Sequence, residues 1–326
     1  MRRAYRALAG TVTLGGIAAV SYRATKTIMN HVQSRNSWDC SSAAYKHIDK
    51  FSGNCAITAD TVKCSDRLAE QNAEIINSWK EKYSLPWMEP ISHEDYLRAA
   101  NHEELMTLTP TRKVPFSWYG GCGGKQVLGL AAGGGQQMAI LSALGARCTV
   151  FDISQQQLAS DRLVSQREGY EIRLIKGDMT QPLPFGDNSF DYVVNPVSNH
   201  YIEEVCPVFA EIYRVLKPGG TFLAGLDTGI YWAFWGKEED RLVNRLPFDP
   251  LKDENLRKRL MEEDMSLVFS HTLEEQIGGQ LKAGFILKDL LEDTNEAGPF
   301  YEYNVPVFIL TRAVKQGQAD ACAGLR

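Results

Sequence analysis

Three consecutive glycines, Gly133 to Gly135, follow a short apolar run in the stretch VLGLAAGGGQQ, residues 127–137. Glycines in such a loop allow the backbone to approach a ligand unusually closely. Two acids follow at the ends of apolar segments, Asp152 after RCTVF and Asp178 in KGDMT. The carboxylate of Asp152 is placed to accept hydrogen bonds from two ribose hydroxyls, and that of Asp178 to face an adenine amino group. These residues predict a site for an adenosine-bearing ligand.

The glycine loop lacks the features that bind phosphate. A dinucleotide fingerprint, G-x-G-x-x-G, needs a third glycine, and Gln136 follows the glycines instead. A Walker loop ends in Gly-Lys followed by Ser or Thr, whereas Gln136-Gln137 supplies no cation. We therefore expect a ligand without phosphate.

A second group of polar residues, NPVSNHY from Asn195 to Tyr201, follows an apolar segment. We expect these side chains to line a pocket for a second substrate, with His200 as a general base. The alternative for His200 is a half-exposed histidine at a helix start. His271 precedes a capping-box pattern, Thr272 to Glu275, which also explains that region by local helix-start chemistry.

From residue 125 the chain alternates apolar strands with helices, a pattern typical of a parallel sheet covered on both faces. The expected fold is α/β, a doubly wound Rossmann-like sheet of seven strands, mostly parallel with an antiparallel closing strand. Ligands in such folds bind beyond the carboxyl ends of the strands. The expected strands are residues 125–130, 147–152, 170–178, 190–196, 221–227, 285–293 and 304–314. The expected helices are residues 136–145, 154–169 and 202–216, and one that begins at Thr272.

Together these motifs resemble the class I S-adenosylmethionine-dependent methyltransferases, in particular the type 11 small-molecule group. The block from Phe190-Asp191 to RVLKPGG, residues 214–220, has that group's pattern. A narrower resemblance, over residues 72–315, is to an uncharacterised bacterial branch that shares LTPTRKVP, AAGGGQQ, FDISQQQLASDR, GDMT, NPVSN and TLEEQIGGQLKAGF.

This resemblance implies S-adenosylmethionine as the cofactor and a small molecule as the methyl acceptor. No metal is expected. The expected cofactor-binding residues are Ala131, Gly133, Gly135, Gln136, Asp152, Ile153, Asp178, Met179 and Asn195. The expected acceptor-binding residues are Ser198, Asn199, Tyr201 and His271, beside the catalytic His200.

One departure from the family concerns the first strand. The family carries an acid that faces the ammonium of the cofactor, and Gly129 stands there, with Ala131 in place of the first loop glycine. A backbone carbonyl near Gly133 or the amide of Gln136 is the expected substitute. The departure leaves open an alternative function, a non-catalytic cofactor-binding or assembly protein.

Composition argues against nucleic acid as a partner. The formal net charge is −5 and the pI is near 5.8, whereas nucleic-acid binders normally present a basic face. A nucleic-acid amino-methyltransferase would also carry a second proline and an aromatic after Asn195-Pro196, where Val197-Ser198 stands. The sequence does not indicate an oligomeric state.

Residues 1–35 include several basic residues, and no acid occurs before Asp39. This composition predicts that residues 1–35 form a leader. We expect a mitochondrial transit peptide. The alternatives are a membrane anchor or secretory signal built on the uncharged residues 7–22, and a cytoplasmic protein with an inert tail. Further expected parts are an extension at 36–71, a helical cap at 72–120 that folds over the cofactor cleft, the methyltransferase domain at 121–315 with an insertion at 227–270, and a tail at 316–326.

Overall fold

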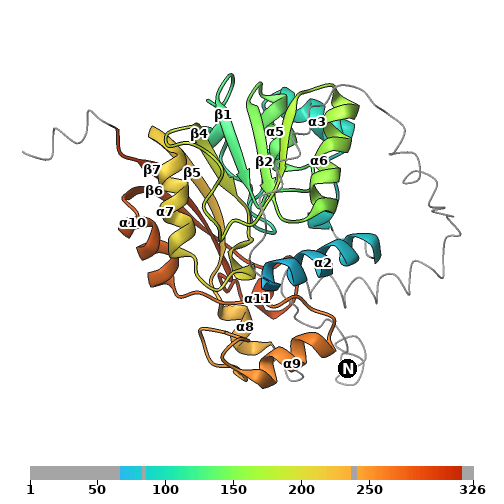
Figure 1. Ribbon diagram of the computed structural model, residues 1–326, viewed down its shortest axis with the longest axis vertical. Coiled ribbons are helices and arrows are strands. Elements are labelled where there is room, and N and C mark those ends of the chain that lie inside the picture. Colours follow the sequence, from blue (N-terminus) through green and yellow to red (C-terminus); the bar gives the residue numbers. More distant parts are fainter. Residues whose placement is uncertain (1–66, 83–85, 236–240, 318–326) are drawn as a thin grey trace, which may run out of the picture.

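A single seven-stranded sheet organises the part of the chain that the computed structural model describes, residues 67–82, 86–235 and 241–317 (Figure 1). The strand order is β3-β2-β1-β4-β5-β7-β6. Strands β1 to β5 pair in parallel, and β7 pairs antiparallel with both β5 and β6. The predicted sheet with its antiparallel closing strand is confirmed. The strands are β1 (Gln126–Leu130), β2 (Arg147–Asp152), β3 (Ile172–Lys176), β4 (Phe190–Asn195), β5 (Leu216–Asp227), β6 (Phe285–Asp293) and β7 (Phe308–Lys315).

Helices cover both faces of the sheet (Figure 1), with α7 and α10 on one side and α3, α5 and α6 on the other. Before the sheet come α2 (Arg67–Lys82), η3 (Pro86–Met88), α3 (His93–Ala100) and α4 (Phe116–Tyr119). Between strands lie α5 (Gln137–Ala143), α6 (Gln155–Glu168), η4 (Asn199–Tyr201), α7 (Cys206–Val215), α8 (Ile230–Phe234), α9 (Glu254–Glu262), η5 (Glu274–Gly278), α10 (Gly279–Lys282) and α11 (Pro299–Glu302).

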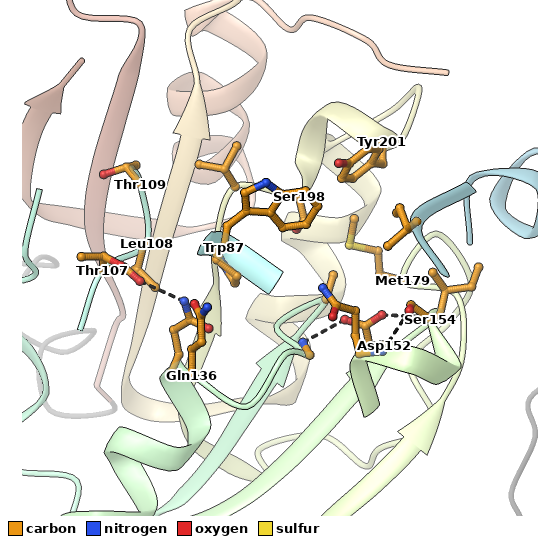
Figure 2. Close-up of a pocket in the computed structure, with 18 of the residues that line it drawn as sticks. Trp87, Thr107, Leu108, Thr109, Gln136, Asp152, Ser154, Met179, Ser198 and Tyr201 are labelled. Carbon is orange, nitrogen blue, oxygen red and sulfur yellow. Dashed lines mark hydrogen bonds between the residues drawn. The ribbon is translucent and has the colours of Figure 1, made fainter. Parts of the chain in front are cut away.

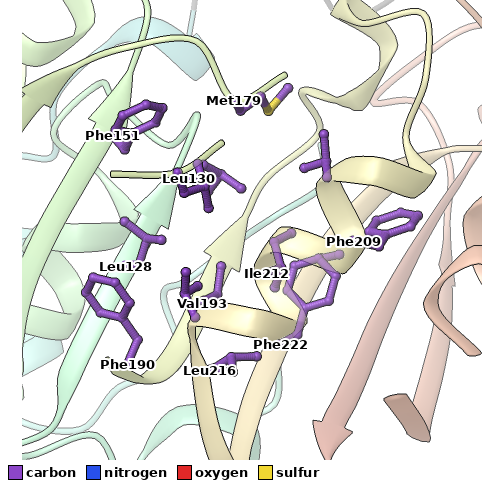
Figure 3. Close-up of a cluster of buried hydrophobic side chains, with 14 of the residues drawn as sticks. Leu128, Leu130, Phe151, Met179, Phe190, Val193, Phe209, Ile212, Leu216 and Phe222 are labelled. Carbon is purple, nitrogen blue, oxygen red and sulfur yellow. The ribbon is translucent and has the colours of Figure 1, made fainter. Parts of the chain in front are cut away.

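Alternate side chains of the central strands enter two separate hydrophobic cores. Leu128 and Leu130 of β1 pack with Phe209 of α7 on one face, in the cluster of Figure 3. Val127 of the same strand packs with Ile140 of α5 on the other face. Burial on both sides explains why these strands are apolar throughout.

Local end signals predicted several helix boundaries correctly. The hydroxyl of Ser154 accepts a hydrogen bond from the N–H of Gln157 at the start of α6, and Gly169 ends that helix in the left-handed conformation. The expected capping box is also present, because the N–H of Glu275 donates to Thr272 Oγ1 and the N–H of Thr272 donates to the Glu275 carboxylate.

Other boundaries differ from the expectation. The strand expected from Thr221 begins at Leu216, so that KPGG, residues 217–220, lies within β5, where the pairing with β4 shifts register and Gly219 has a φ of +79°. The helix expected from Ile202 begins at Cys206, with Pro207 in its first turn. The helix expected from Thr272 opens as the π-helix η5 before it continues as α10.

The domain boundary predicted between residues 71 and 72 falls inside α2, because residues 67–71 form the start of that helix. The predicted leader, most of the extension and residues 318–326 of the tail lie outside the described residues. Within 67–82, 86–235 and 241–317, no helix combines the length and apolar character needed to cross a membrane.

Candidate active site

A cavity of about 440 Å³ lies at the carboxyl ends of the parallel strands, where doubly wound folds bind their ligands. The strand order reverses between β1 and β4, and the loops after these strands form its floor. Nine of the predicted site residues line this cavity, namely Ala131, Gly133, Gln136, Asp152, Ile153, Asp178, Met179, Ser198 and Tyr201.

The glycine loop is built against Asp152. The N–H of Gly133 donates to Asp152 Oδ2 at 2.9 Å, and the N–H of Ser154 donates to Oδ1 at 2.8 Å (Figure 2). A Cβ at position 133 would lie 2.8 Å from Asp152 Oδ2 and 2.7 Å from the Cβ of Gln157. Burial raises the pKa of Asp152, and the charge of Lys80 and the backbone hydrogen bonds oppose that rise. The carboxylate retains lone pairs for a ligand in the cavity.

Asp178 lies at the same edge, in the turn after β3. Its Oδ1 accepts hydrogen bonds from the N–H of Thr180 at 2.9 Å and from the Thr180 hydroxyl at 2.8 Å. These bonds fix the carboxylate in the cavity wall beside Met179. The positions of Asp152 and Asp178 at neighbouring strand ends match the predicted arrangement.

The space that an acid at position 129 would need is filled by Met138. A Cβ at Gly129 would lie 2.9 Å from both Cγ and Sδ of Met138. The proposed substitute, the amide of Gln136, donates to the carbonyl of Glu89 at 2.6 Å. Ala131, which replaces the first loop glycine, has a φ of +46°, a conformation that glycine adopts more easily.

Asn195 and Gly135 support the cavity from behind and do not line it. The side-chain amide of Asn195 is fully buried and donates to the carbonyl of Leu130 at 2.7 Å and to Ser198 Oγ at 2.8 Å. It therefore joins the ends of β1 and β4. Gly135 packs on α6, where a Cβ would lie 3.0 Å from the carbonyl oxygen of Ser160.

His200, Asn199 and His271 also lie outside the cavity lining, which corrects their expected positions. The short 3₁₀ turn η4 places the His200 ring in the interior, 3.9 Å from the ring of Tyr201, so the half-exposed alternative is wrong too. Burial and then the neighbouring His271 lower the pKa of His200 to about 3. His271 Nε2 is hydrogen-bonded to the carbonyl of Asn199 at 3.1 Å, and burial lowers the pKa of His271. Asn199, His200 and His271 therefore lie close to one another in the interior.

A large part of the cavity wall comes from residues within 72–120, the segment expected to fold over the cleft, which the site prediction did not name one by one. In the view of Figure 2, Trp87 and Ser198 lie in the middle of the wall, between Asp152 and Thr109. Thr109 belongs to the motif LTPTRKVP. Because this motif lies outside the sheet, its presence was a signal in the sequence for this part of the wall. The lining residues that the site prediction did not name include Ile76, Trp87, Ile91, Leu105, Thr107, Leu108, Thr109, Pro110, Gln157, Asn295 and Glu296.

Polar side chains bind helix α2 to the end of the cavity where Asp152 lies. Asn77 Oδ1 accepts a hydrogen bond of 2.7 Å from the hydroxyl of Ser154. Lys80 Nζ donates to Gln157 Oε1 at 2.7 Å and to the carbonyl of Met88 at 2.8 Å, and burial lowers the Lys80 pKa. Helix α2 therefore contacts the same elements that hold Asp152.

Comparison with known proteins identifies the family. Residues 128–224 match the family model described as a methyltransferase domain. The uncharacterized methyltransferase YbaJ of Bacillus subtilis (strain 168) is 38% identical over 214 residues, which cover 64% of this chain and 83% of that protein. The chain belongs to the class I S-adenosylmethionine-dependent methyltransferases.

Two further similarities are partial. A sterol 24-C-methyltransferase of Gibberella zeae is 34% identical over 102 residues, and the match spans 30% of this chain and about a quarter of that protein, 27%. A crystal structure of an S-adenosylmethionine-dependent methyltransferase from Mesorhizobium loti has a TM-score of 0.48 at 20% identity, covering 60% of this methyltransferase and 92% of that chain.

The residues of the cavity fit S-adenosylmethionine, the cofactor of this methyltransferase. Asp152 presents a carboxylate for the ribose hydroxyls. The loop at Gly133 lies so close to Asp152 that no side chain fits at that position. No lysine or arginine among the described residues lines the cavity, so it has no cation for a phosphate. When bound, the cofactor supplies a methyl group activated by the positively charged sulfur to which it is attached.

Proposed function

We propose that this methyltransferase transfers the methyl group of S-adenosylmethionine to a small, largely apolar molecule. The observation that carries the proposal is the character of the cavity wall beyond the cofactor residues. That wall is formed mostly by apolar side chains, and its apolar members include Ile76, Trp87, Ile91, Leu105, Leu108, Pro110, Pro196, Val197 and Ile202. Apolar walls with a few placed polar groups are typical of small-molecule sites.

The cap supports a small acceptor over a macromolecule. Ala69, Asn72 and Ile76 of α2 and Trp87 of η3 contribute to the lining, so part of the wall comes from elements that precede the sheet. A protein or nucleic-acid strand would have to displace these elements. The net charge of −5 also disfavours a polyanion.

The chemistry assigned to this site is methyl transfer governed by position and orientation. In-line attack on an activated methyl group requires mainly that the two reacting atoms be held in contact. No histidine lines the cavity in the described part of the chain. Any side-chain base in this lining is therefore a carboxylate, such as Glu296, and we propose an acceptor whose attacking carbon or oxygen needs no stronger base. The name of the partial relative, a sterol 24-C-methyltransferase, supports an apolar acceptor.

The test is a transfer assay with the full chain and S-adenosylmethionine labelled on the methyl group. A panel of sterols, quinones and isoprenoid alcohols is compared with bulk transfer RNA and a protein mixture. We expect label in at least one apolar small molecule and none in the macromolecules. Label only in RNA or protein would contradict the proposal. Cofactor binding with no transfer to any candidate would favour the alternative, a non-catalytic cofactor-binding protein.

A further inference from the structure

A second buried carboxylate, Asp161, holds the glycine loop without lining the cavity. It lies on α6, is fully buried, and its Oδ2 accepts a hydrogen bond of 2.9 Å from the N–H of Gly134. The preceding N–H, that of Gly133, is bound by Asp152 Oδ2 at 2.9 Å. Carboxylates from two different elements therefore fix two consecutive N–H groups of the loop.

The loop conformation that Asp161 holds is one that few residues other than glycine adopt. Gly134 has a φ of +134° and Gly135 a φ of +74°. An added Cβ at Gly135 would lie 2.8 Å from Val164 Cγ2, so the loop also packs directly on α6. Removal of the Asp161 carboxylate would leave the N–H of Gly134 without that bond at the point where the loop turns. Asp161 thus fixes the geometry of the cofactor loop.

Asp161 also places an ionisable carboxyl group in the interior of the protein. Burial raises its pKa to about 7; the charge of Asp152 raises it, and the hydrogen bond from Gly134 and the charge of Lys80 lower it. Its Oδ1 has no hydrogen-bond partner among the described residues. A positive charge brought near such a group favours its ionised form.

We propose that Asp161 is a positioning residue of the cofactor site whose negative charge favours S-adenosylmethionine over its product, S-adenosylhomocysteine. The two ligands share the adenosine and amino-acid groups, but only the cofactor carries a positive sulfur. When it is ionised, the carboxylate behind the loop attracts that sulfur through an interior of low dielectric constant. The inference is independent of the acceptor.

The experiment is calorimetric titration of the full chain with S-adenosylmethionine and, separately, with S-adenosylhomocysteine. Asp161→Asn keeps the size of the side chain and an oxygen that can accept the N–H of Gly134, so it removes mainly the charge. We expect affinity for the cofactor to fall about tenfold and affinity for the product less than about threefold. The control Glu171→Gln removes one exposed negative charge just beyond α6 and should leave both affinities unchanged.

Equal weakening of both ligands by Asp161→Asn, or no weakening, would overturn the charge-selective role. The wild-type protein provides a second test that does not depend on the variant folding. Between about pH 6 and about pH 8, the ratio of cofactor to product affinity should rise as Asp161 loses its proton. A flat ratio would overturn the proposal.

Among the described residues, four other titratable groups lie near Asp161 and bear on the pH test. Burial raises the pKa of Cys148 to about 12 and also raises that of Tyr170, so neither changes charge in this range. Asp152, with a raised pKa, and Lys80, with a lowered pKa, also face the loop. The part of the rise in the affinity ratio that disappears in Asp161→Asn is assigned to Asp161. A rise that the variant retains in full would contradict the proposal.

Discussion

Asn72 and Leu267 are joined by two reciprocal hydrogen bonds across 195 positions of the sequence. Asn72 Nδ2 donates to the carbonyl of Leu267 at 2.9 Å, and the N–H of Leu267 donates to Asn72 Oδ1 at 2.9 Å. The same Nδ2 donates to the carbonyl of Tyr201 at 3.3 Å. One side-chain amide on α2 therefore binds the insertion and the turn that carries Ser198 and Tyr201. It links α2 to the part of the cavity wall that Ser198 and Tyr201 form.

Substitution of Asn72 by alanine should destabilise the protein, because the N–H and carbonyl of Leu267 would lose their partner. The expected loss in free energy of unfolding is about 1–3 kcal/mol, measured by urea denaturation. Cofactor release should also become faster, since α2 contributes to the cavity wall. Gln71→Ala, at the neighbouring exposed position of the same helix, is the control. A loss as small as that of Gln71→Ala would show that the two bonds do not anchor the cap.

Gly133→Ala should weaken cofactor binding at least tenfold, because the new Cβ would overlap Asp152 Oδ2 and Gln157. Such overpacking costs about 1–3 kcal/mol, and it displaces the carboxylate assigned to the ribose. Calorimetry measures the affinity, and thermal unfolding checks the fold. Gly121→Ala is the matched control, because its Cβ would meet nothing closer than Tyr192 Oη at 3.5 Å. Unchanged cofactor affinity in Gly133→Ala would contradict the close approach of loop and ligand.

The buried His200 should make stability depend on pH. Its pKa is about 3 in the folded protein and near 6.5 when unfolded. Between these values the unfolded chain binds a proton that the folded chain does not bind. The stabilisation that comes from keeping His200 neutral is therefore complete above pH 6.5. It is lost as the pH falls below that value, by about 1.4 kcal/mol of unfolding free energy per pH unit. Urea unfolding between about pH 7 and about pH 5 should show a steeper fall for the wild type than for His200→Phe. Identical slopes would contradict the buried, neutral state.

The same variant tests the catalytic role predicted for His200. Because its side chain does not line the cavity, His200→Phe should retain turnover within about twofold once the fold is confirmed, compared with the 10²–10⁴-fold that a general base typically contributes. The turnover number is measured with the acceptor that the transfer assay identifies. A loss of a hundredfold in a folded variant would restore His200 as the base.

Local patterns explain which parts of the site were predictable. Asp152, Asp178 and the glycines each end or follow a short apolar strand, and parallel strands bring such ends together whatever the long-range packing. The mostly parallel sheet with its antiparallel closing strand could be expected from the alternation of strands and helices. Ser154 and Gly169 marked the ends of α6 through backbone chemistry that involves only neighbouring residues.

The remaining residues depend on packing that no short pattern encodes. His200 follows Asn199 in a segment that reads as a polar loop, and only the 3₁₀ turn directs its ring inward. Asp161 looks like an ordinary solvated acid of a helix until α6 packs on the glycine loop. Asn295 and Thr109 reach the cavity because Asp293 binds the N–H groups of Thr111 and Arg112, a contact across 182 and 181 positions.

The cavity is assigned to S-adenosylmethionine, with the ribose on Asp152. The most direct test is calorimetric titration of the full chain with S-adenosylmethionine, with NAD as the control ligand and Asp152→Asn as the second protein. We predict micromolar binding of S-adenosylmethionine, no binding of NAD, and at least a tenfold loss of affinity in the variant, as expected for hydrogen bonds to a charged group. No binding of S-adenosylmethionine to the wild type, or equal binding to both proteins, would contradict this assignment of the cavity.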